Sequence, residues 1–464
     1  MTSPQPMPAA SAEGRPLPPS RFWRLDRQRS REVLALALPI IAAMVSQNVL
    51  NLVDTAMVAH LGAPVLAGVG LASFLNFMAV AFITGLSSAV QAMAARRVGE
   101  GKLDETAIPL NGGILLSAAL GIPLAALLIW QAPNILRLLN DDPAVVAAGT
   151  TYLQLRLLGV AAIGMNFSFR GYWSAIKLAR LYMFTLLGMH SFNIALNYCL
   201  IFGRFGLPEL GVVGAGMGTS ISVWLGTITY FVLGFRHARP GGFLARRPSR
   251  EQFGNLLRLG LPSSIQQLFF AGGFTVLFWI VGKVGTQELA VANVLINISL
   301  VAVLPAVGFG LAAATLAGQA LGRRDAIDAH RWAWDVIKVA SLLLGAVGLP
   351  MLLLPRQILH LFVQDPALVE IGAFPLRLIG AGIIIDGMGL VMMHALFGVG
   401  AARWVMAVSV GLQWGLFLPV AYLLGPVWGL GLSAIWLAMT AYRALQSLVL
   451  ANVWQRRRWV HLRV

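Results

Sequence analysis

The sequence predicts an all-α polytopic membrane protein, with twelve transmembrane helices in two pseudo-symmetric six-helix lobes. Three observations lead to this fold: the composition, the placement of the basic residues and an internal repeat. Of the 464 residues, 58% are hydrophobic and only 11% are charged, whereas soluble proteins carry about 25% charged residues. A water-soluble enzyme is therefore not expected. We assign the net charge of +16 to the cytoplasmic sides of membrane spans rather than to nucleic-acid binding.

The apolar residues form runs long enough to cross a membrane. A spanning helix needs about 20 apolar residues, and such runs must be helical because lipid cannot satisfy free backbone groups. The twelve runs are 33–58, 65–94, 107–130, 147–171, 181–202, 211–235, 259–282, 288–318, 335–354, 371–399, 404–424 and 427–452. The expected organisation is a disordered cytoplasmic tail (1–30), an N-lobe (31–235), a basic cytoplasmic linker (236–258), a C-lobe (259–452) and a basic cytoplasmic tail (453–464).

The basic residues lie mainly on one side of these spans. If the N-terminus is cytoplasmic, 26 of the 34 Lys and Arg fall in cytoplasmic segments and 6 fall on the opposite face. Cytoplasmic loops carry an excess of Lys and Arg in membrane proteins. An odd number of spans would scramble this pattern in the second half. We therefore expect twelve spans with both termini in the cytoplasm.

An internal repeat relates the two halves at an offset of 223 positions. Each unit contains six spans, an even number, so both units insert the same way up. The units should be related by an axis along the membrane normal, with a substrate path between the lobes. The matched pairs include Pro39 with Pro262, Gly62 with Gly285, Gly85 with Gly308, Gly99 with Gly322 and Arg180 with Arg403.

Two acids, Asp54 and Asp386, lie well inside apolar spans. A charged Asp at mid-membrane costs about 2.5–3.5 kcal/mol on insertion scales, and such residues are functional by default. Each is therefore a candidate to carry a proton. The alternative is a neutral Asp that is hydrogen-bonded to a neighbouring helix.

Amide side chains accompany the first of these acids. Gln47 and Asn51 precede Asp54 at helical spacing, so the three share one helix face. Asn193 and Asn197 in the fifth span are four residues apart and also share a face. We expect these groups to form one polar pocket in the first lobe. The alternative is that the amides only join helices by hydrogen bonds.

Candidate groups in the second lobe are fewer. His394 follows Asp386 by eight residues, at about 80° around the helix, which does not favour a relay between them. Gln266 and Gln267 in the seventh span are candidates to line a substrate cavity, with helix packing as the alternative.

Motifs for cofactor chemistry are missing from the sequence. It contains no GxxxxGK[ST], no HExxH and no paired CxxC, and Cys199 is its single cysteine. We therefore expect no cofactor, no enzymatic activity and no bound metal, unless Na⁺ binds at Asp54.

Several segments resemble the multidrug and toxic compound extrusion (MATE) family of transporters. The resemblance covers about 30–450 and is strongest in the first, fifth and sixth spans. The family consists of antiporters that exchange H⁺ or Na⁺ for organic cations and other drugs, with two six-helix lobes. The similar segments include LVDTAMVAHLG (52–62), LAGVGLASF (66–74), FRGYWSAIKLAR (169–180) and LPSSIQQLFF (261–270).

The resemblance implies roles for individual residues. Asp54 matches the first-span acid that is tied to cation coupling, Asn193 and Asn197 match a polar pair in the fifth span, and Thr219 matches a threonine near the same pocket. Asp386 matches the tenth-span acid of the NorM-type branch. The seventh span reads QQLFFAGG where that branch usually has a Glu. The resemblance therefore favours the first lobe as the coupling site.

We therefore expect a cation-coupled antiporter that works by alternating access, as a monomer in the plasma (inner) membrane of a bacterium. The partners are H⁺ or Na⁺, organic cations or drugs, and the lipid bilayer, with no nucleic acid. The main alternative is a lipid-linked oligosaccharide flippase of the same superfamily, which would line its cavity with Arg and Lys. The nearest candidates for that role, Arg170 and Arg443, are expected towards span ends. A membrane-embedded enzyme is a weaker alternative because the seven histidines are scattered.

Overall fold

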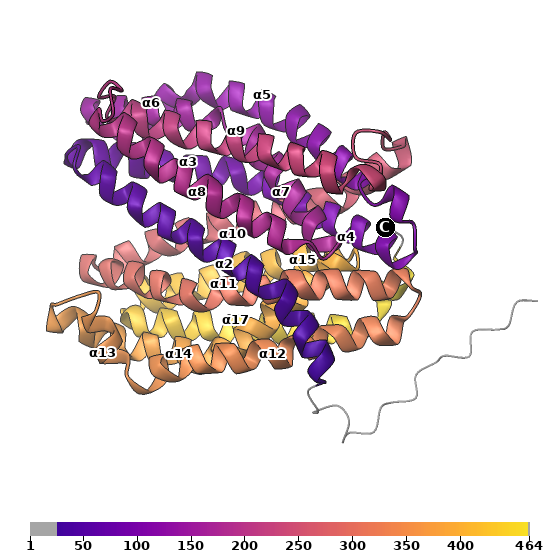
Figure 1. The fold of residues 1–464 in the computed structure, drawn as a ribbon. Helices are drawn as coiled ribbons and strands as arrows, with labels where there is room; N and C mark the ends of the chain where they lie inside the picture. The colour runs from indigo at the N-terminus through magenta and orange to yellow at the C-terminus, as the bar shows by residue number, and fades with distance from the viewer. Residues whose placement is uncertain (1–25, 463–464) are drawn as a thin grey trace, which may run out of the picture.

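A computed structural model describes residues 26–462, and these residues form helices and turns without any strand (Figure 1). Within this range, 11 helices are long and apolar enough to cross a membrane. The pair α6 and α7, which is bent by 47°, gives a twelfth span. The predicted all-α architecture of twelve spans is confirmed.

The N-lobe contains α2 (Arg27–Ala59), α3 (Ala63–Thr84), α4 (Leu86–Gly99), α5 (Ile108–Leu139), α6 (Pro143–Leu157), α7 (Val160–Ala175), α8 (Ala179–Phe202) and α9 (Val212–His237). The C-lobe contains α10 (Arg250–Val284), α11 (Thr286–Gly322), α12 (Ala326–Leu353), α13 (Pro355–His360), α14 (Pro366–Gly398), α15 (Ala402–Leu412), α16 (Leu418–Tyr422) and α17 (Gly431–Gln455). Two π-helical turns, η3 (Gln413–Phe417) and η4 (Leu423–Val427), flank α16. Short 3₁₀ turns are η1 (Leu103–Glu105), η2 (Arg239–Gly241) and η5 (Arg458–His461).

Two boundaries differ from the predicted domain limits. α10 begins at Arg250, inside the segment 236–258 predicted as linker, because Ser249 and Gln252 form a capping box that starts the helix early. α2 begins at Arg27 because the Asp26 side chain accepts hydrogen bonds from the first turn. Most of the predicted tail 1–30 lies outside the described residues.

The contacts between the lobes reflect the sequence repeat. A Cβ atom on Gly85 would lie 2.3 Å from the backbone nitrogen of Ser264. Its repeat partner Gly308 faces Ile41 in the same way, at 2.5 Å from Cγ1, and Ile41 is the repeat partner of Ser264. Paired contacts of this kind are the signature of a two-fold axis between the lobes. In each contact a glycine lies against a neighbouring helix, which lets the two helices pack closely.

We call one end of the bundle the basic end, where α2 begins and where α4, α11 and α17 finish. There, a Cβ on Gly99 would lie 2.8 Å from the Cα of its own repeat partner, Gly322. Residues related by a two-fold axis touch each other only next to that axis. α4 and α11 therefore meet on the axis at the basic end, as expected for two units inserted the same way up.

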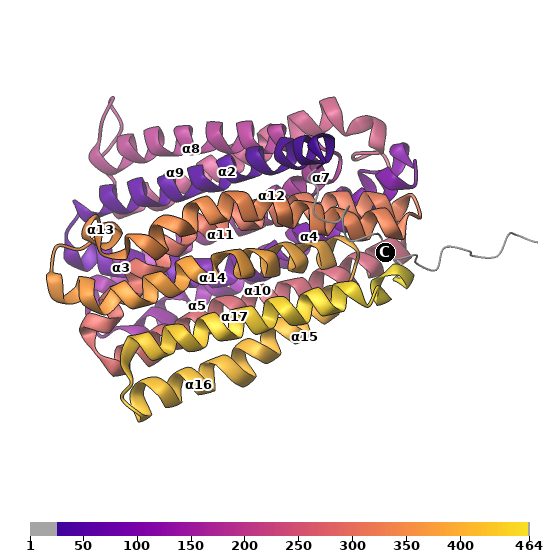
Figure 2. The ribbon, with the colours of Figure 1, turned by 90° about the horizontal axis from the view of Figure 1, so that it is seen from below.

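Helix α2 belongs to both lobes. Its first half contributes Val33, Leu36 and Ala37 to the hydrophobic core of the C-lobe, whereas Met57 and Val58 pack in the N-lobe core. Figure 1 shows α2 crossing obliquely from the N-lobe helices to the C-lobe helices, and Figure 2 shows its first half beside α12 and α11. A displacement of α2 would therefore change the packing of both lobes.

Polar side chains join the lobes in the half of the bundle that includes the basic end. Gln91 of α4 donates to the Leu311 carbonyl at 2.8 Å and to the Thr315 hydroxyl at 2.9 Å. Gln319 of α11 donates to the Ala175 carbonyl at 2.8 Å. Arg29 of α2 forms ion pairs with Asp328 and Asp335 of α12, at 2.6 and 2.7 Å. The structure thus captures the lobes in an arrangement that is joined at the basic end.

Candidate functional site

Asp54 lies where α2 packs against α8 in the N-lobe. The Nδ2 atom of Asn197 donates to Asp54 Oδ1 at 2.9 Å. Within residues 26–462, no Lys or Arg lies within salt-bridge distance of this carboxylate. The Arg156 guanidinium acts on Asp54 only through longer-range charge attraction, without a salt bridge. The carboxylate, held by a neutral amide, therefore remains available to a proton or a small cation.

Asn197 is the centre of this cluster. It lies one turn after Asn193 on α8, and both side chains are only 1% exposed. Its Nδ2 atom also lies 3.1 Å from Asn193 Oδ1 and 3.3 Å from the hydroxyl of Thr219 on α9. Thr219 donates its own proton to the Ala215 carbonyl, so it accepts from Asn197. The structure therefore brings together Asp54, Asn193, Asn197 and Thr219, the four residues predicted for cation coupling.

One oxygen in the cluster has no partner. Asn197 Oδ1 is buried without a hydrogen bond, although buried polar atoms are almost always paired. Gly218 allows this oxygen to lie against α9, because a Cβ there would be 2.1 Å from it. The cluster therefore offers an unused acceptor next to Asp54, which suits a protonated acid or a small cation.

Gln47 and Asn51 do not contact Asp54 directly. Gln47 Nε2 donates to Asn51 Oδ1 at 3.1 Å, and Gln47 Oε1 lies 3.0 Å from Nε2 of His190 on α8. His190 is buried beside these amides, and sequence reasoning missed it. The available signal was its spacing, since His190 lies three and seven residues before Asn193 and Asn197 and shares their helix face.

Asp386 in the C-lobe is paired with a fixed cation. Arg443 Nη1 lies 3.1 Å from Asp386 Oδ1. The expectation that Arg443 lies towards a span end is wrong, because it sits at the middle of α17. The mean hydropathy of that run stays high despite Arg443, because the neighbouring residues are apolar. A coupling ion at Asp386 would have to displace this guanidinium.

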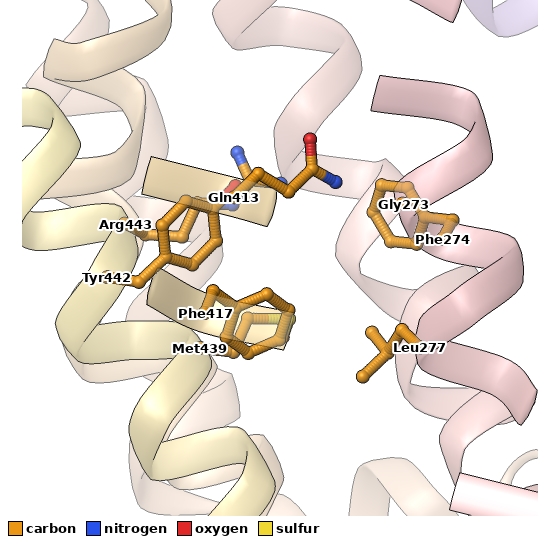
Figure 3. Close-up of a pocket in the computed structure, with 8 residues that line it drawn as sticks. All are labelled: Gly273, Phe274, Leu277, Gln413, Phe417, Met439, Tyr442 and Arg443. Atoms are coloured by element: carbon orange, nitrogen blue, oxygen red, sulfur yellow. The ribbon is translucent and has the colours of Figure 1, made fainter. Parts of the chain in front are cut away.

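Arg443 also borders a small cavity between α10, η3 and α17 (Figure 3). The cavity offers about 10 Å³ to the centre of a water-sized sphere, which is room for about one water molecule. It is too small for a drug in this conformation. Its lining residues are Gly273, Phe274, Leu277, Gln413, Phe417, Met439, Tyr442 and Arg443.

The remaining predicted residues lie apart from both acids. Gln266 is buried and its Oε1 has no partner, whereas Gln267 one position on is exposed. His394 Nδ1 lies 2.8 Å from the Leu390 carbonyl of its own helix, and no hydrogen bond joins it to Asp386. The role of Gln266 and Gln267 in lining a substrate cavity stays a prediction.

The acids and histidines are dispersed through the described part of the chain. Residues 26–462 contain no group of three or more His, Cys, Asp or Glu side chains that could hold a metal ion. At Asp54, one carboxylate lies beside amide and hydroxyl groups.

The sequence profile of the MatE family matches residues 39–199 and 262–423. The chain belongs to the MatE family. The two matches start 223 residues apart, which is the offset of the internal repeat. MatE proteins are multidrug efflux transporters of the membrane and not enzymes, so the predicted family and class are confirmed.

Relatives and solved structures agree with this assignment. The chain is 30% identical to the multidrug resistance protein NorM of Burkholderia vietnamiensis over 436 residues, which cover 90% of this chain and 92% of the relative. It is 27% identical to NorM of Photobacterium profundum over 94% of this chain and 96% of the relative. The fold is similar to that of a MATE transporter described as outward-facing, with a TM-score of 0.85, 22% identity and coverage of 94% and 97%.

Proposed function

We propose that this MatE protein exports organic cations and other drugs in exchange for H⁺ or Na⁺, which binds at Asp54. The single observation that carries the proposal is the Asp54 cluster. Asp54 has no ionic partner in the described residues and lies beside an unused buried acceptor. Asp386, by contrast, already has a counter-ion. The curated relatives named as multidrug resistance proteins support drugs as the exported class.

From the positive-inside rule we infer that the basic end and both termini face the cytoplasm. The bacterial relatives support the inner membrane of a bacterium as the location. The lobes are joined at this end through Gln91, Gln319 and Arg29. With this orientation, we infer that the arrangement seen here is the one closed towards the cytoplasm. Loading a drug from the cytoplasm requires these contacts to open. We infer that the lobes alternate by rocking about the two-fold axis, within a monomer.

Ion binding at Asp54 changes its hydrogen bonds. As a carboxylate, Asp54 accepts from the Asn197 amide. A protonated Asp54 donates instead, and Asn197 Oδ1 is the acceptor available to it. α2 carries Asp54 in the N-lobe and packs its first half in the C-lobe, so the change can act on both lobes. The ion drives the exchange only through its different affinity for the two lobe arrangements.

A lipid-linked oligosaccharide flippase is less well supported. Such a protein needs free basic side chains to hold pyrophosphate. Arg443 is neutralised by Asp386. Arg170 hydrogen-bonds the Ser87 hydroxyl and lies 4.3 Å over the ring of Phe167. Neither arginine joins a basic cluster within a span.

Imposed ion gradients on the reconstituted protein test the proposal. Proteoliposomes are equilibrated with the same ethidium concentration inside and outside and are then given an inward H⁺ gradient, an inward Na⁺ gradient or neither, and protein-free liposomes serve as the control. We expect one gradient to drive ethidium out against its own concentration gradient. Ethidium movement that only runs down its own gradient, whichever ion gradient is applied, would show a channel or uniporter and contradict the proposal.

A further inference from the structure

A groove opens between α2 and α8 at the basic end, where α2 leaves α8 to cross towards the C-lobe (Figure 1). It offers about 430 Å³ to the centre of a water-sized sphere. This space lies within the range of small-molecule sites, about 300–1,000 Å³. The lining consists of two arginines and six apolar side chains. A ligand that matches the groove therefore needs a charged part and an apolar part.

The two arginines of the groove, Arg31 and Arg180, are exposed. Within residues 26–462, neither lies within salt-bridge distance of an Asp or Glu side chain. The neighbouring cations differ, because the protein itself supplies their acids: Lys177 pairs with Glu32, and Arg29 pairs with two acids of α12. The groove therefore presents two positive charges that are open to an external anion.

An apolar stripe leads away from the charged part of the groove. Ala35, Leu38 and Ala42 follow Arg31 along one face of α2 at helical spacing, and Met183 contributes from α8. The stripe from Arg31 to Ala42 is about 16 Å long at 1.5 Å per residue. One leaflet of the membrane has a hydrocarbon depth of about 15 Å, half of the core. The groove thus combines a basic head with an apolar channel of one leaflet's depth.

We propose that this groove binds an anionic phospholipid of the cytoplasmic leaflet. Arg31 and Arg180 hold the phosphate, because guanidinium groups form strong, charge-assisted hydrogen bonds with phosphate oxygens. One acyl chain lies along the apolar stripe of α2. Basic pockets between helices on the cytoplasmic side are typical sites for anionic head groups, and the positive-inside rule assigns the basic end to that side.

The charge of the groove disfavours the other candidate occupants. Two arginines repel an organic cation, so the groove does not suit the proposed substrates. Residues 1–25 of this chain carry three Arg and one Glu, so this net positive segment is repelled as well. An inorganic anion would satisfy the arginines but would leave the apolar stripe without a partner. A phospholipid matches both parts of the lining.

Native mass spectrometry of the full-length protein tests the proposal. The detergent-solubilised protein is titrated with phosphatidylglycerol, which is anionic, or with phosphatidylethanolamine of the same acyl chains, which is zwitterionic. We expect phosphatidylglycerol to bind more tightly, at one saturable site. Arg31→Gln combined with Arg180→Gln should weaken this binding about twentyfold, because each basic residue at an anionic lipid surface contributes about a factor of five. Equal binding of the two lipids by the wild-type protein would overturn the proposal.

Arg247→Gln combined with Arg250→Gln is the matched control. It removes the same charge from exposed residues at the start of α10, outside the groove, and should keep the affinity within about twofold of the wild type. An equal loss in both double variants would show general charge attraction and would overturn the proposal. Ala35→Trp should also weaken binding because its ring fills the groove without a change of charge. Val45→Trp, at an exposed position of α2 outside the groove, should not.

Three further measurements identify the occupant and its position. Phosphatidylglycerol with a diazirine on one acyl chain, in nanodiscs, should cross-link to peptides that contain residues 31–42 or 180–183. Cross-links confined to other helices would overturn the proposal even if the variants do not fold. Inorganic phosphate in large excess should not displace the lipid, and deletion of residues 2–24 should leave its affinity unchanged. Full displacement by phosphate would show a simple anion site, and a large gain on deletion would show the N-terminal segment as the native occupant; either result would overturn the proposal.

Discussion

At the residue scale, the central contact of the site is the hydrogen bond from the Asn197 amide to the Asp54 carboxylate. The two N–H groups of this amide face the carboxylate and two neutral oxygens, and its own oxygen is unpaired. A hydrogen bond to a charged group contributes about 1.5–3 kcal/mol. The same i, i+4 pair of asparagines recurs at Asn293 and Asn297 in α11. There the Asn297 amide bonds only to Asn293 of its own helix and is exposed, whereas the Asn197 amide also bonds to α2 and α9. Spacing alone does not distinguish the two pairs.

Asn197→Ala should therefore lower the rate of ethidium exchange by about ten- to a hundredfold, because a loss of 1.4 kcal/mol corresponds to about a factor of ten. Initial rates in proteoliposomes measure the effect. Asn297→Ala is the control and should keep a rate within about twofold of the wild type, since its amide contacts only its own helix. Equal losses in the two variants would show that Asn197 has no special relation to the ion site.

The sequence could predict which residues share a helix face, but not which faces meet. Periodicity placed Gln47, Asn51 and Asp54 together, and resemblance added Thr219. It did not show that Gln47 meets His190, because that contact depends on the packing of α2 on α8. Asp386 was likewise predicted without its partner, since Arg443 lies on a different helix of the same lobe.

At the element scale, the site depends on the close approach of α8 and α9. Gly218 lies against Asn197, and Gly214 lies close to the backbone of Leu200, since a Cβ on Gly214 would be 2.6 Å from the Leu200 carbonyl carbon. Small residues let membrane helices pack closely. Gly214 and Gly218 therefore serve the packing of α9 on α8, whereas Gly216 between them faces Leu155 of α6.

Gly218→Ala should separate α8 from α9 or push Asn197 away from Asp54. Overpacking of this kind costs about 1–3 kcal/mol of folding free energy. The unfolding temperature in detergent and the rate of ethidium exchange should both be lower than in the wild type. Gly188→Ala on α8 is the matched control, since a Cβ there meets nothing within 4 Å, and it should leave both unchanged. Wild-type stability and exchange in Gly218→Ala would refute the claim that this packing positions the site.

At the scale of the whole molecule, hydropathy and the repeat were enough to predict twelve spans in two lobes, because both signals are carried by many residues. The arrangement of the lobes was not predictable, since it depends on contacts between residues far apart in the chain. Arg29 is the clearest example. It comes from the predicted tail, yet it pairs with Asp328 and Asp335 and stacks 3.6 Å over Trp332.

Arg29→Gln should weaken the contact between the two lobes at the basic end. Partly exposed ion pairs contribute about 0–1 kcal/mol and a cation–π contact about 0.5–2 kcal/mol, so the population open at this end should rise by about two- to a hundredfold. Spin labels at Lys102→Cys and Arg324→Cys, in a Cys199→Ala background, report the distance between the lobes. Arg323→Gln is the control because Arg323 contacts Asp328 within one lobe. A distance distribution unchanged by Arg29→Gln would exclude Arg29 as a latch.

The most direct test of the account is the ion dependence of exchange in Asp54→Asn. This variant keeps a side chain of the same size beside Asn197 but cannot bind a proton or supply a carboxylate. We predict that proteoliposomes with Asp54→Asn bind ethidium but fail to move it against its gradient under any imposed H⁺ or Na⁺ gradient. Asp386→Asn should retain gradient-driven export if it folds. Gradient-driven export by Asp54→Asn at the wild-type rate would contradict the central claim.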